Sequence, residues 1–333
     1  MTRRSRASWA LAGLGVALAA ALLIAAEPRR VIALARSASW SGLLVAFAWS
    51  VALTTLRGLR LSLLAPGRLP ARRAVAVAAV AQFAVGVLPM RLGDLALLPL
   101  LAAAGVPGAV RGLSFLVLVR LLDVGAVLVW GMAAAALAGG RTAVLAAAFG
   151  ALALLAAVAA GAGRVALRLL VRRWRRRPGV RRRALRQALE VRRELRHLAR
   201  SPLRALACVA VSLLVWAAIW GVSVSLLRAM RLGWPAASVL VGVIGAAVAS
   251  ALPVNAVGTF GSQEAGWSAA LAGVGVAPAA ALAAGFATHV WTVAFQAVLG
   301  LLALGYLLAR QPGNVASELR ARLRKRLRSG GAA

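Results

Sequence analysis

Two stretches decide the fold of this chain: residues 88–107, LPMRLGDLALLPLLAAAGVP, and residues 252–278, LPVNAVGTFGSQEAGWSAALAGVGVAP. Each begins with Leu-Pro, followed by glycine and then a carboxylate. An apolar run comes next and ends in a turn rich in Gly and Pro. The two runs, 94–105 and 263–273, are shorter than the ~20 residues that an ordinary membrane-spanning helix needs. Broken segments at matching positions in two halves of a membrane protein indicate a transport site at membrane depth.

The sequence around these stretches is that of a membrane protein. Its 333 residues are 62% hydrophobic, with a mean hydropathy of +0.87, and its long uncharged runs are typical of membrane-spanning helices. These runs are continuous, whereas the strands of a transmembrane barrel alternate between apolar and polar residues. An open sheet would leave backbone groups unpaired in lipid. The sequence therefore predicts an all-α, polytopic transmembrane helix bundle with two broken or re-entrant half-helices.

We expect a series of full spans, of which the first begins near the N-terminus. Residues 9–26 follow a short basic stretch and resemble a signal peptide, but the run is longer than a usual signal and further spans follow. We interpret it as an uncleaved span. The predicted full spans are 9–26, 40–56, 74–88, 113–138, 142–162, 203–227, 237–252 and 279–309, and the two short segments complete the set.

Basic residues set the predicted orientation. The chain carries 40 Lys and Arg against 7 acidic residues, a net charge of +33, and basic residues in membrane proteins concentrate in cytoplasmic loops. Residues 57–73, 163–202 and 310–333 are strongly basic and are predicted to be cytoplasmic. All three basic segments lie on the same side of the membrane only if each short segment crosses the membrane or reverses the chain direction in an equivalent way. This arrangement places both termini in the cytoplasm and the two motifs at opposite sides of the membrane, as in an inverted repeat.

We interpret residues 1–333 as a single integral membrane domain of a cell membrane, plasma or inner. A first half, 9–162, and a second half, 203–309, flank the basic cytoplasmic segment 163–202, and the basic tail 310–333 follows. Apolar residues recur every three to four positions within the basic segment and predict an amphipathic helix. That helix either docks on anionic lipid headgroups or serves only to fix the topology.

Three acidic residues, Asp94, Asp123 and Glu264, lie within apolar sequence. Ionisable groups at membrane depth are costly and mark candidate functional sites. Arg120 and Asp123 are three residues apart, so they share a helix face and can pair; Arg91 and Asp94 have the same spacing. These four side chains either form a polar cluster whose guanidinium groups recognise phosphate or make two internal ion pairs that only fix helix packing.

The second motif contains a predicted helix start. Ser262 is the expected N-cap, which places Glu264 in the first helical turn. The free amides of that turn, approached through Gly258 and Gly261, form an anion site, or else Glu264 only offsets the positive end of the helix dipole. Asn255 supplies a neutral polar contact beside it.

His289 lies in the last long span. An imidazole changes charge near neutral pH, so His289 either takes part in transport or makes a hydrogen bond between helices. The sequence has no nucleophile motif, no ATP-binding motif and no Cys/His spacing for a metal, so we expect no cofactor. The basic segments lack a nucleic-acid-binding motif, which leaves membrane lipids and their anionic headgroups as the expected partners.

Together these residues resemble the family of flippase-like integral membrane proteins named after the transmembrane region of lysylphosphatidylglycerol synthases. Members share a Pro, Arg, Gly and acidic cluster, then an Arg–Asp helix, then a motif of Pro, Gly and Glu. The matching residues here are Pro89, Arg91, Gly93 and Asp94, then Arg120 and Asp123, then Pro253, Asn255, Gly258, Gly261 and Glu264. The resemblance covers roughly residues 9–310. Asp94 departs from the commoner Glu, and His289 departs from the expected basic residue, often Arg.

The resemblance implies movement of an amphiphile between leaflets, such as an aminoacylated phospholipid or a polyprenyl-linked glycan. The expected substrate-binding residues are Arg91, Gly93, Asp94, Arg120, Asp123, Asn255, Gly258, Gly261, Ser262, Glu264 and His289, with no catalytic residue. One alternative is an intramembrane transferase acting on a lipid-linked donor, although such enzymes usually have a larger loop bearing acidic residues and the longest loop here is almost wholly basic. The other is a non-catalytic membrane partner of a lipid-modifying synthase or glycosyltransferase.

Overall fold

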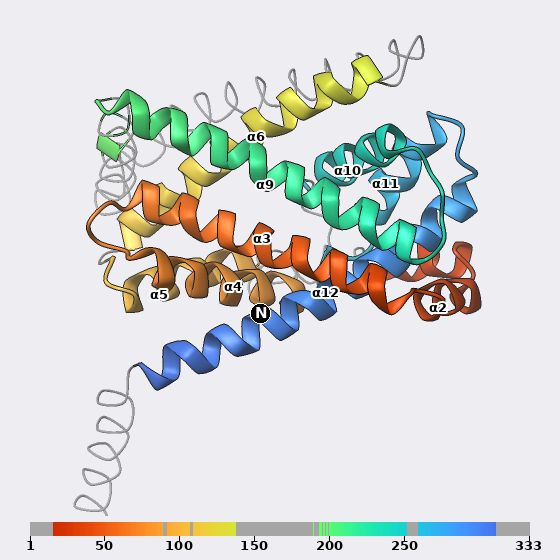
Figure 1. Cartoon of the computed structure of the whole chain (residues 1–333), viewed down its shortest axis with the longest axis horizontal. Coiled ribbons are helices and arrows are strands. Elements are labelled where there is room, and N and C mark those ends of the chain that lie inside the picture. The colour runs from red at the N-terminus through yellow and green to blue at the C-terminus, as the bar shows by residue number, and fades with distance from the viewer. Residues whose placement is uncertain are drawn as a thin grey trace, which may run out of the picture.

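A computed structural model shows a bundle of helices, and every regular element in the described part of the chain is helical (Figure 1). The structure describes residues 16–88, 92–106, 109–137, 200–251 and 259–310, together with 189, 193, 194, 196 and 198. The predicted span 142–162, most of the predicted amphipathic segment and the tail beyond residue 310 lie outside these ranges. The predicted helical membrane bundle is confirmed.

In the described part of the chain, four helices are long and apolar enough to cross a membrane. They are α3 (Trp40–Leu64), α6 (Ala109–Leu137), α9 (Pro202–Ala229) and α12 (Pro278–Ala309). Helix α3 runs eight residues past the predicted span 40–56, so the expected cytoplasmic loop at 57–73 is wrong for its first half. The helix continues because its two central arginines, Arg57 and Arg60, find polar partners inside the bundle.

A short helix, α2 (Pro28–Arg36), joins the first apolar helix, Val16–Ala25, to α3. Pro28 favours the helix start because its fixed φ suits the first helical position. Val31 is buried while the arginines of α2 are exposed. The indole Nε1 of Trp291 donates to the carbonyl of Ala35 at 3.1 Å, which anchors α2 to α12.

Two pairs of short helices lie between the long ones: α4 (Ala71–Val87) with α5 (Leu92–Ala103), and α10 (Ala236–Ser250) with α11 (Ser262–Ala272). The predicted spans 74–88 and 237–252 are helices of nearly the predicted length, but each is shorter than a full crossing needs. At 1.5 Å per residue, α4 and α10 measure only about 26 and 22 Å, less than the ~30 Å of a hydrocarbon core.

Each short pair is a hairpin that returns to the end of the bundle from which it starts. A Cβ on Gly105, just after α5, would lie 3.7 Å from the carbonyl oxygen of Arg68, just before α4. In the second half, Val274 and Val276 after α11 pack in the same cluster as Met230 before α10. Both hairpins therefore have the shape of re-entrant segments, as the broken motifs predict.

The two halves of the bundle repeat the same order of helices. Helices α3 to α6 have 25, 17, 12 and 29 residues, and α9 to α12 have 28, 15, 11 and 32. The hairpins also end alike: Val106 donates to Leu101 at 2.9 Å, and Val276 donates to Leu271 at 3.1 Å. Both turns contain a glycine at positive φ, which suits a residue without a Cβ.

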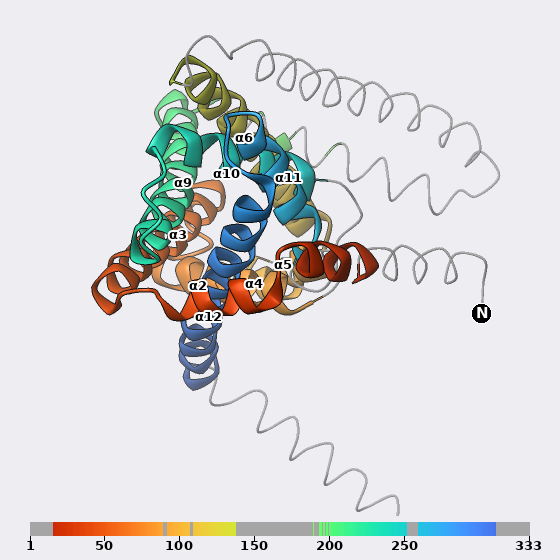
Figure 2. The same cartoon turned by 90° about the vertical axis from the view of Figure 1, so that its right-hand side faces the viewer.

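The two halves are inverted relative to one another. Helices α3 and α9 pack antiparallel, since Gly42 lies beside Ala229 and Arg60 bonds to Ser212. They lie side by side in both views (Figures 1 and 2). Helix α4 packs on α12 just as α10 packs on α6, so each hairpin contacts the final long helix of the other half. The predicted inverted repeat is present in the described structure.

Glycines allow the helices to approach closely. A Cβ on Gly245 of α10 would lie 2.4 Å from the carbonyl oxygen of Gly266 in α11, and one on Gly58 of α3 would lie 2.4 Å from Cα of Val75 in α4. Small residues at such crossings are typical of membrane bundles, where close van der Waals packing holds helices together. The hairpin α10–α11 therefore depends on its two facing glycines.

Replacing Gly266 by alanine tests this packing. The new Cβ would lie 2.3 Å from the carbonyl oxygen of Gly245, so the helices must separate, and we expect a loss of about 1–3 kcal/mol in the free energy of unfolding. The thermal unfolding midpoint of the detergent-purified protein measures the loss. The matched control is Gly125→Ala in α6, where a Cβ meets no atom within 4 Å. Equal midpoints for the two variants would contradict the prediction.

Candidate functional site

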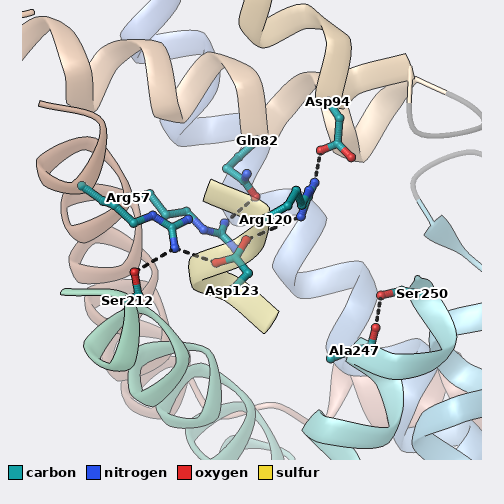
Figure 3. A network of polar contacts seen from close by, with 9 residues as sticks. Arg57, Gln82, Asp94, Arg120, Asp123, Ser212, Ala247 and Ser250 are labelled. Carbon is teal, nitrogen blue, oxygen red and sulfur yellow. Dashed lines mark hydrogen bonds and ion pairs between the residues drawn. The ribbon is translucent and has the colours of Figure 1, made fainter. Parts of the chain in front are cut away.

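Polar side chains from five helices meet in the first half of the bundle (Figure 3). We call this set the first-half cluster: Arg57 and Arg60 of α3, Gln82 of α4, Asp94 of α5, Arg120 and Asp123 of α6, and Ser212 of α9. Three of the predicted residues, Asp94, Arg120 and Asp123, lie in it. Arg91, predicted to join them, lies outside the described residues.

Arg120 links the start of α5 to α6. One guanidinium nitrogen, Nη2, lies 2.5 Å from Oδ1 of Asp94, and Nη1 lies 3.6 Å from Oδ2 of Asp123. The predicted pairing of Arg120 and Asp123 across one helix turn is confirmed. Asp94 is the third residue of α5, where a carboxylate also offsets the positive end of the helix dipole.

Arg60 holds the inner side of the cluster. Its Nη1 donates to Oδ1 of Asp123 at 2.6 Å and to Oγ of Ser212 at 3.3 Å, and the residue is only 3% exposed. The Ser212 hydroxyl in turn donates to the carbonyl of Cys208 at 2.7 Å. A charge this deeply buried requires a partner, because removing it from water without one is very costly.

Arg57 lies one turn before Arg60 on the same helix. Its Nη1 donates to the amide oxygen Oε1 of Gln82, a neutral acceptor. Sequence reasoning missed Arg57 and Arg60 because basic residues after a span are taken for a cytoplasmic loop. It missed Gln82 because this neutral side chain lies inside a predicted span and carries no charge to mark it. One available signal was that the apolar positions continue from Leu61 to Leu64, which extends the helix past both arginines.

The first-half cluster surrounds a small cavity with an excess of positive charge. The cavity measures about 80 Å³, enough for more than one water molecule. Three guanidinium groups and two carboxylates line it, which leaves one net positive charge among these side chains. The lining residues that carry charge are Arg57, Arg60, Arg120, Asp94 and Asp123, and apolar side chains of α5 and α6 complete the wall.

One charged side chain of the cavity reaches an apolar surface. The Arg120 side chain is 48% exposed, whereas that of Asp123 is 17% exposed. Nearby on α5 and α6, Leu95, Leu121 and Val124 are exposed as well. A polar site bordered by exposed apolar side chains is matched to a molecule with a polar head and an apolar tail.

The second half contains a smaller and fully buried pair. Glu264 of α11 is 1% exposed and His289 of α12 is 5% exposed, and Oε1 of Glu264 is hydrogen-bonded to Nδ1 of His289. The imidazole stacks on the ring of Phe260, with centroids 4.0 Å apart and planes inclined by 16°. The predicted hydrogen bond between helices is therefore present.

The helix start at Glu264 differs from the expected one. The N-cap is Gly261, with φ of 96°, and Ser262 is the first helical residue. Gly261 takes this position because a left-handed φ is easiest without a Cβ. Its amide donates to Oε2 of Glu264 at 2.7 Å, so the chain's own carboxylate occupies one of the amides that an anion would use.

The two clusters occupy equivalent places in the inverted halves. Asp94 and Glu264 are each the third residue of the second hairpin helix. Each pairs with a basic residue of the following long helix, 26 residues later at Arg120 and 25 residues later at His289. No hydrogen bond or ion pair joins Asp94, Arg120 or Asp123 to Glu264 or His289, so the predicted single site is divided between the two halves.

The other predicted site residues have simpler places or none. Gly93 lies where α5 touches α4, and a Cβ there would be 2.3 Å from Cα of Val85. Gly93 also lines the first-half cavity, so it lies at the site as well as at a close helix contact. Asn255 and Gly258 lie outside the described residues. Within the described ranges, no group of three or more His, Cys, Asp or Glu side chains gathers as a metal site would require.

The family described as lysylphosphatidylglycerol synthase TM region matches residues 11–300. The chain belongs to this family. Membership agrees with the order of the three motifs, and it makes the chain a multi-pass membrane protein related to lipid metabolism or transport. Searches of curated proteins and of solved structures each found no match.

The Arg60→Gln variant tests the buried ion pair. Removing the guanidinium leaves the partly exposed Asp123 with only its 3.6 Å contact to Arg120, and we expect a loss of about 1.5–3 kcal/mol in the free energy of unfolding, the contribution of a hydrogen bond to a charged group. The unfolding midpoint measures this, with Arg310→Gln as control because Arg310 is exposed and stacks on Tyr306. Replacing both partners, Arg60→Met with Asp123→Leu, should recover much of the loss. Equal midpoints for Arg60→Gln and Arg310→Gln would refute a structural role for the pair.

Proposed function

We propose that this family member moves an amphiphilic lipid between leaflets, as a flippase or scramblase does. Candidate cargoes are an aminoacyl-phospholipid and a polyprenyl-linked glycan. The observation that carries the proposal is the first-half cavity, which is polar, bears one excess positive charge and has Arg120 beside exposed apolar surface. A soluble substrate would have no use for such apolar surroundings.

The lipid headgroup is the part of the cargo that needs a polar path through the membrane. A charged headgroup does not cross hydrocarbon without a polar path, because every polar group in lipid needs an internal partner. Guanidinium groups suit phosphate through their planar arrangement of donors. In this proposal Arg57 and Arg120 receive the phosphate of the headgroup, while the acyl or prenyl chains remain on the apolar surface near Leu95 and Leu121.

The roles of the arginines follow from their partners. Arg57 contacts a neutral amide, so its positive charge is the one most available to an incoming anion. Arg120 is held by Asp94 and Asp123, which orient its guanidinium toward the cavity and the exposed surface. Arg60 is committed to Asp123 and Ser212 and acts as a positioning residue.

The second half contains the same order of helices as the first half, in the inverted orientation. Transporters built from inverted repeats move substrate by exchanging the conformations of their halves around a site. The carboxylate–base pairs at equivalent positions are the groups that such an exchange would open and close. Downhill movement requires no further energy source, whereas uphill movement requires coupling to an ion or to the membrane potential.

The same carboxylates are poorly suited to an intramembrane transferase. Asp94 pairs with Arg120 and Asp123 pairs with Arg60, so both carboxylates are already bonded to guanidinium groups, whereas a general base must be placed to accept a proton from its substrate. A non-catalytic partner of a synthase or glycosyltransferase would tolerate neutralisation of the cavity. The transport assay below separates this alternative from a translocase.

We expect purified protein in proteoliposomes to accelerate the exchange of fluorescent phospholipids or polyprenyl-phosphate lipids between leaflets. Arg57→Gln, Arg120→Gln and Asp94→Asn should each slow the exchange by about tenfold or more, because a hydrogen bond to a charged group contributes about 1.5–3 kcal/mol. Dithionite quenching of outer-leaflet fluorophore measures the rate.

The control for this assay is Arg310→Gln, which removes an exposed arginine remote in sequence from the cavity. It should exchange lipid like the wild type. If folded Arg57→Gln, Arg120→Gln and Asp94→Asn proteins also match the wild type, the cavity is structural and the membrane-partner alternative takes its place.

A further inference from the structure

The inverted repeat places two different bases at equivalent positions. In the first half, Asp94 pairs with Arg120, whose guanidinium keeps its charge at all working pH values. In the second half, Glu264 pairs with His289, whose imidazole can gain or lose a proton near neutral pH. The two pairs occupy equivalent positions, but the charge of Arg120 is fixed whereas that of His289 is variable.

The basic residues of the two pairs also differ in their exposure to solvent. The Arg120 side chain is 48% exposed, and that of His289 is 5% exposed. The ring of His289 is held on two sides, by Glu264 at Nδ1 and by the stacked ring of Phe260. Both members of this pair are shielded from bulk water.

Among the described residues, Glu264 is the charged side chain that contacts His289. Helix α11 carries no other ionisable side chain. The charged side chains at α2, at the start of α4 and at the end of α9 are exposed, and the arginines of α3 face the first-half cluster. The exposed side chains are Glu27 (the N-cap of α2), Arg29, Arg30 and Arg36 on α2, Arg72 and Arg73 on α4, and Arg228 on α9.

We propose that Glu264 and His289 form a proton-binding site, and that the proton it takes up and releases is coupled to lipid movement. The coupling rests on the function proposed above, whereas the proton site stands on the pair itself. Nδ1 of His289 is committed to Glu264, so the exchangeable proton sits on Nε2 of the same ring. With this proton the pair is neutral overall; without it the pair carries one negative charge.

This change of charge supplies a reason for movement. A net negative charge is unfavourable in a buried site, because desolvation penalises an unpaired ion. Loss of the proton therefore favours a rearrangement in which the start of α11 reaches water or a cation. The first-half pair cannot make this change, since Arg120 stays charged, so only the second half responds to the proton.

Nuclear magnetic resonance tests the proton site without any transport assay. The chain has two histidines, so a His197→Gln protein labelled with ¹⁵N-histidine reports His289 alone. We expect its imidazole nitrogen shifts to change with pH, as a proton-binding ring requires. The Glu264→Gln substitution in the same protein should change this pH dependence. Shifts that do not respond to pH, or a pH dependence that is the same in Glu264→Gln, would overturn the proton site.

Proteoliposome exchange at different pH values tests the coupling. Wild-type exchange should change about fivefold or more over about two pH units, because one titrating proton alters the population of its charged form up to ~10-fold per unit. His289→Arg copies the fixed charge of the first half, and His289→Gln keeps a hydrogen bond without titrating. Both should make exchange insensitive to pH, while His197→Gln should keep the wild-type profile.

The outcomes of the two experiments are distinguishable. A pH profile that survives in both His289 variants would overturn the coupling. An imidazole that titrates in a protein that moves no lipid at any pH would overturn the proposed function and leave the proton site standing. Lipid exchange by a protein whose imidazole does not titrate would overturn the proton site and leave the proposed function standing.

Discussion

The structure depends on one constraint: charged side chains inside an apolar bundle must find their partners within the protein. The carboxylates of Asp94 and Glu264 each meet this requirement in two ways. Each stands at the start of a short helix, where it offsets the helix dipole, and each pairs with a base from the next long helix. The ion pair therefore ties every hairpin to the helix that follows it. Without the pair, the broken helix ends in the middle of the bundle would be left unsatisfied.

Close packing carries this arrangement through the rest of the fold. The hairpins fit between the long helices because glycines such as Gly58, Gly245 and Gly266 let backbones approach. Each hairpin then packs on the last long helix of the other half, so the two halves interlock. The proposed coupling of a proton in one half to lipid movement in the other would act through these contacts.

Much of this architecture could be predicted from the sequence, because Pro, Gly and buried carboxylates are rare and conspicuous in apolar runs. The inverted repeat and the pairing of Arg120 with Asp123 follow from spacing and charge. The roles of Arg57 and Arg60 could not, because the positive-inside rule counts basic residues without showing which way they point. The cap at Gly261 was missed for a different reason: Ser262, a preferred type of N-cap residue, stands directly after it. The division of the site between the halves appears only in three dimensions.

The account stands most directly on the inversion of the two hairpins, which labelling of single cysteines measures. In a Cys208→Ala background, Ala102→Cys at the end of α5 and Ala272→Cys at the end of α11 are matched, exposed positions. A membrane-impermeant maleimide applied to sealed vesicles of known orientation should label one of them from outside and the other only after access to the lumen. Gly67→Cys, in the turn before α4, should label together with Ala102→Cys. Labelling of residues 102 and 272 from the same side would contradict the inverted repeat and the mechanism built on it.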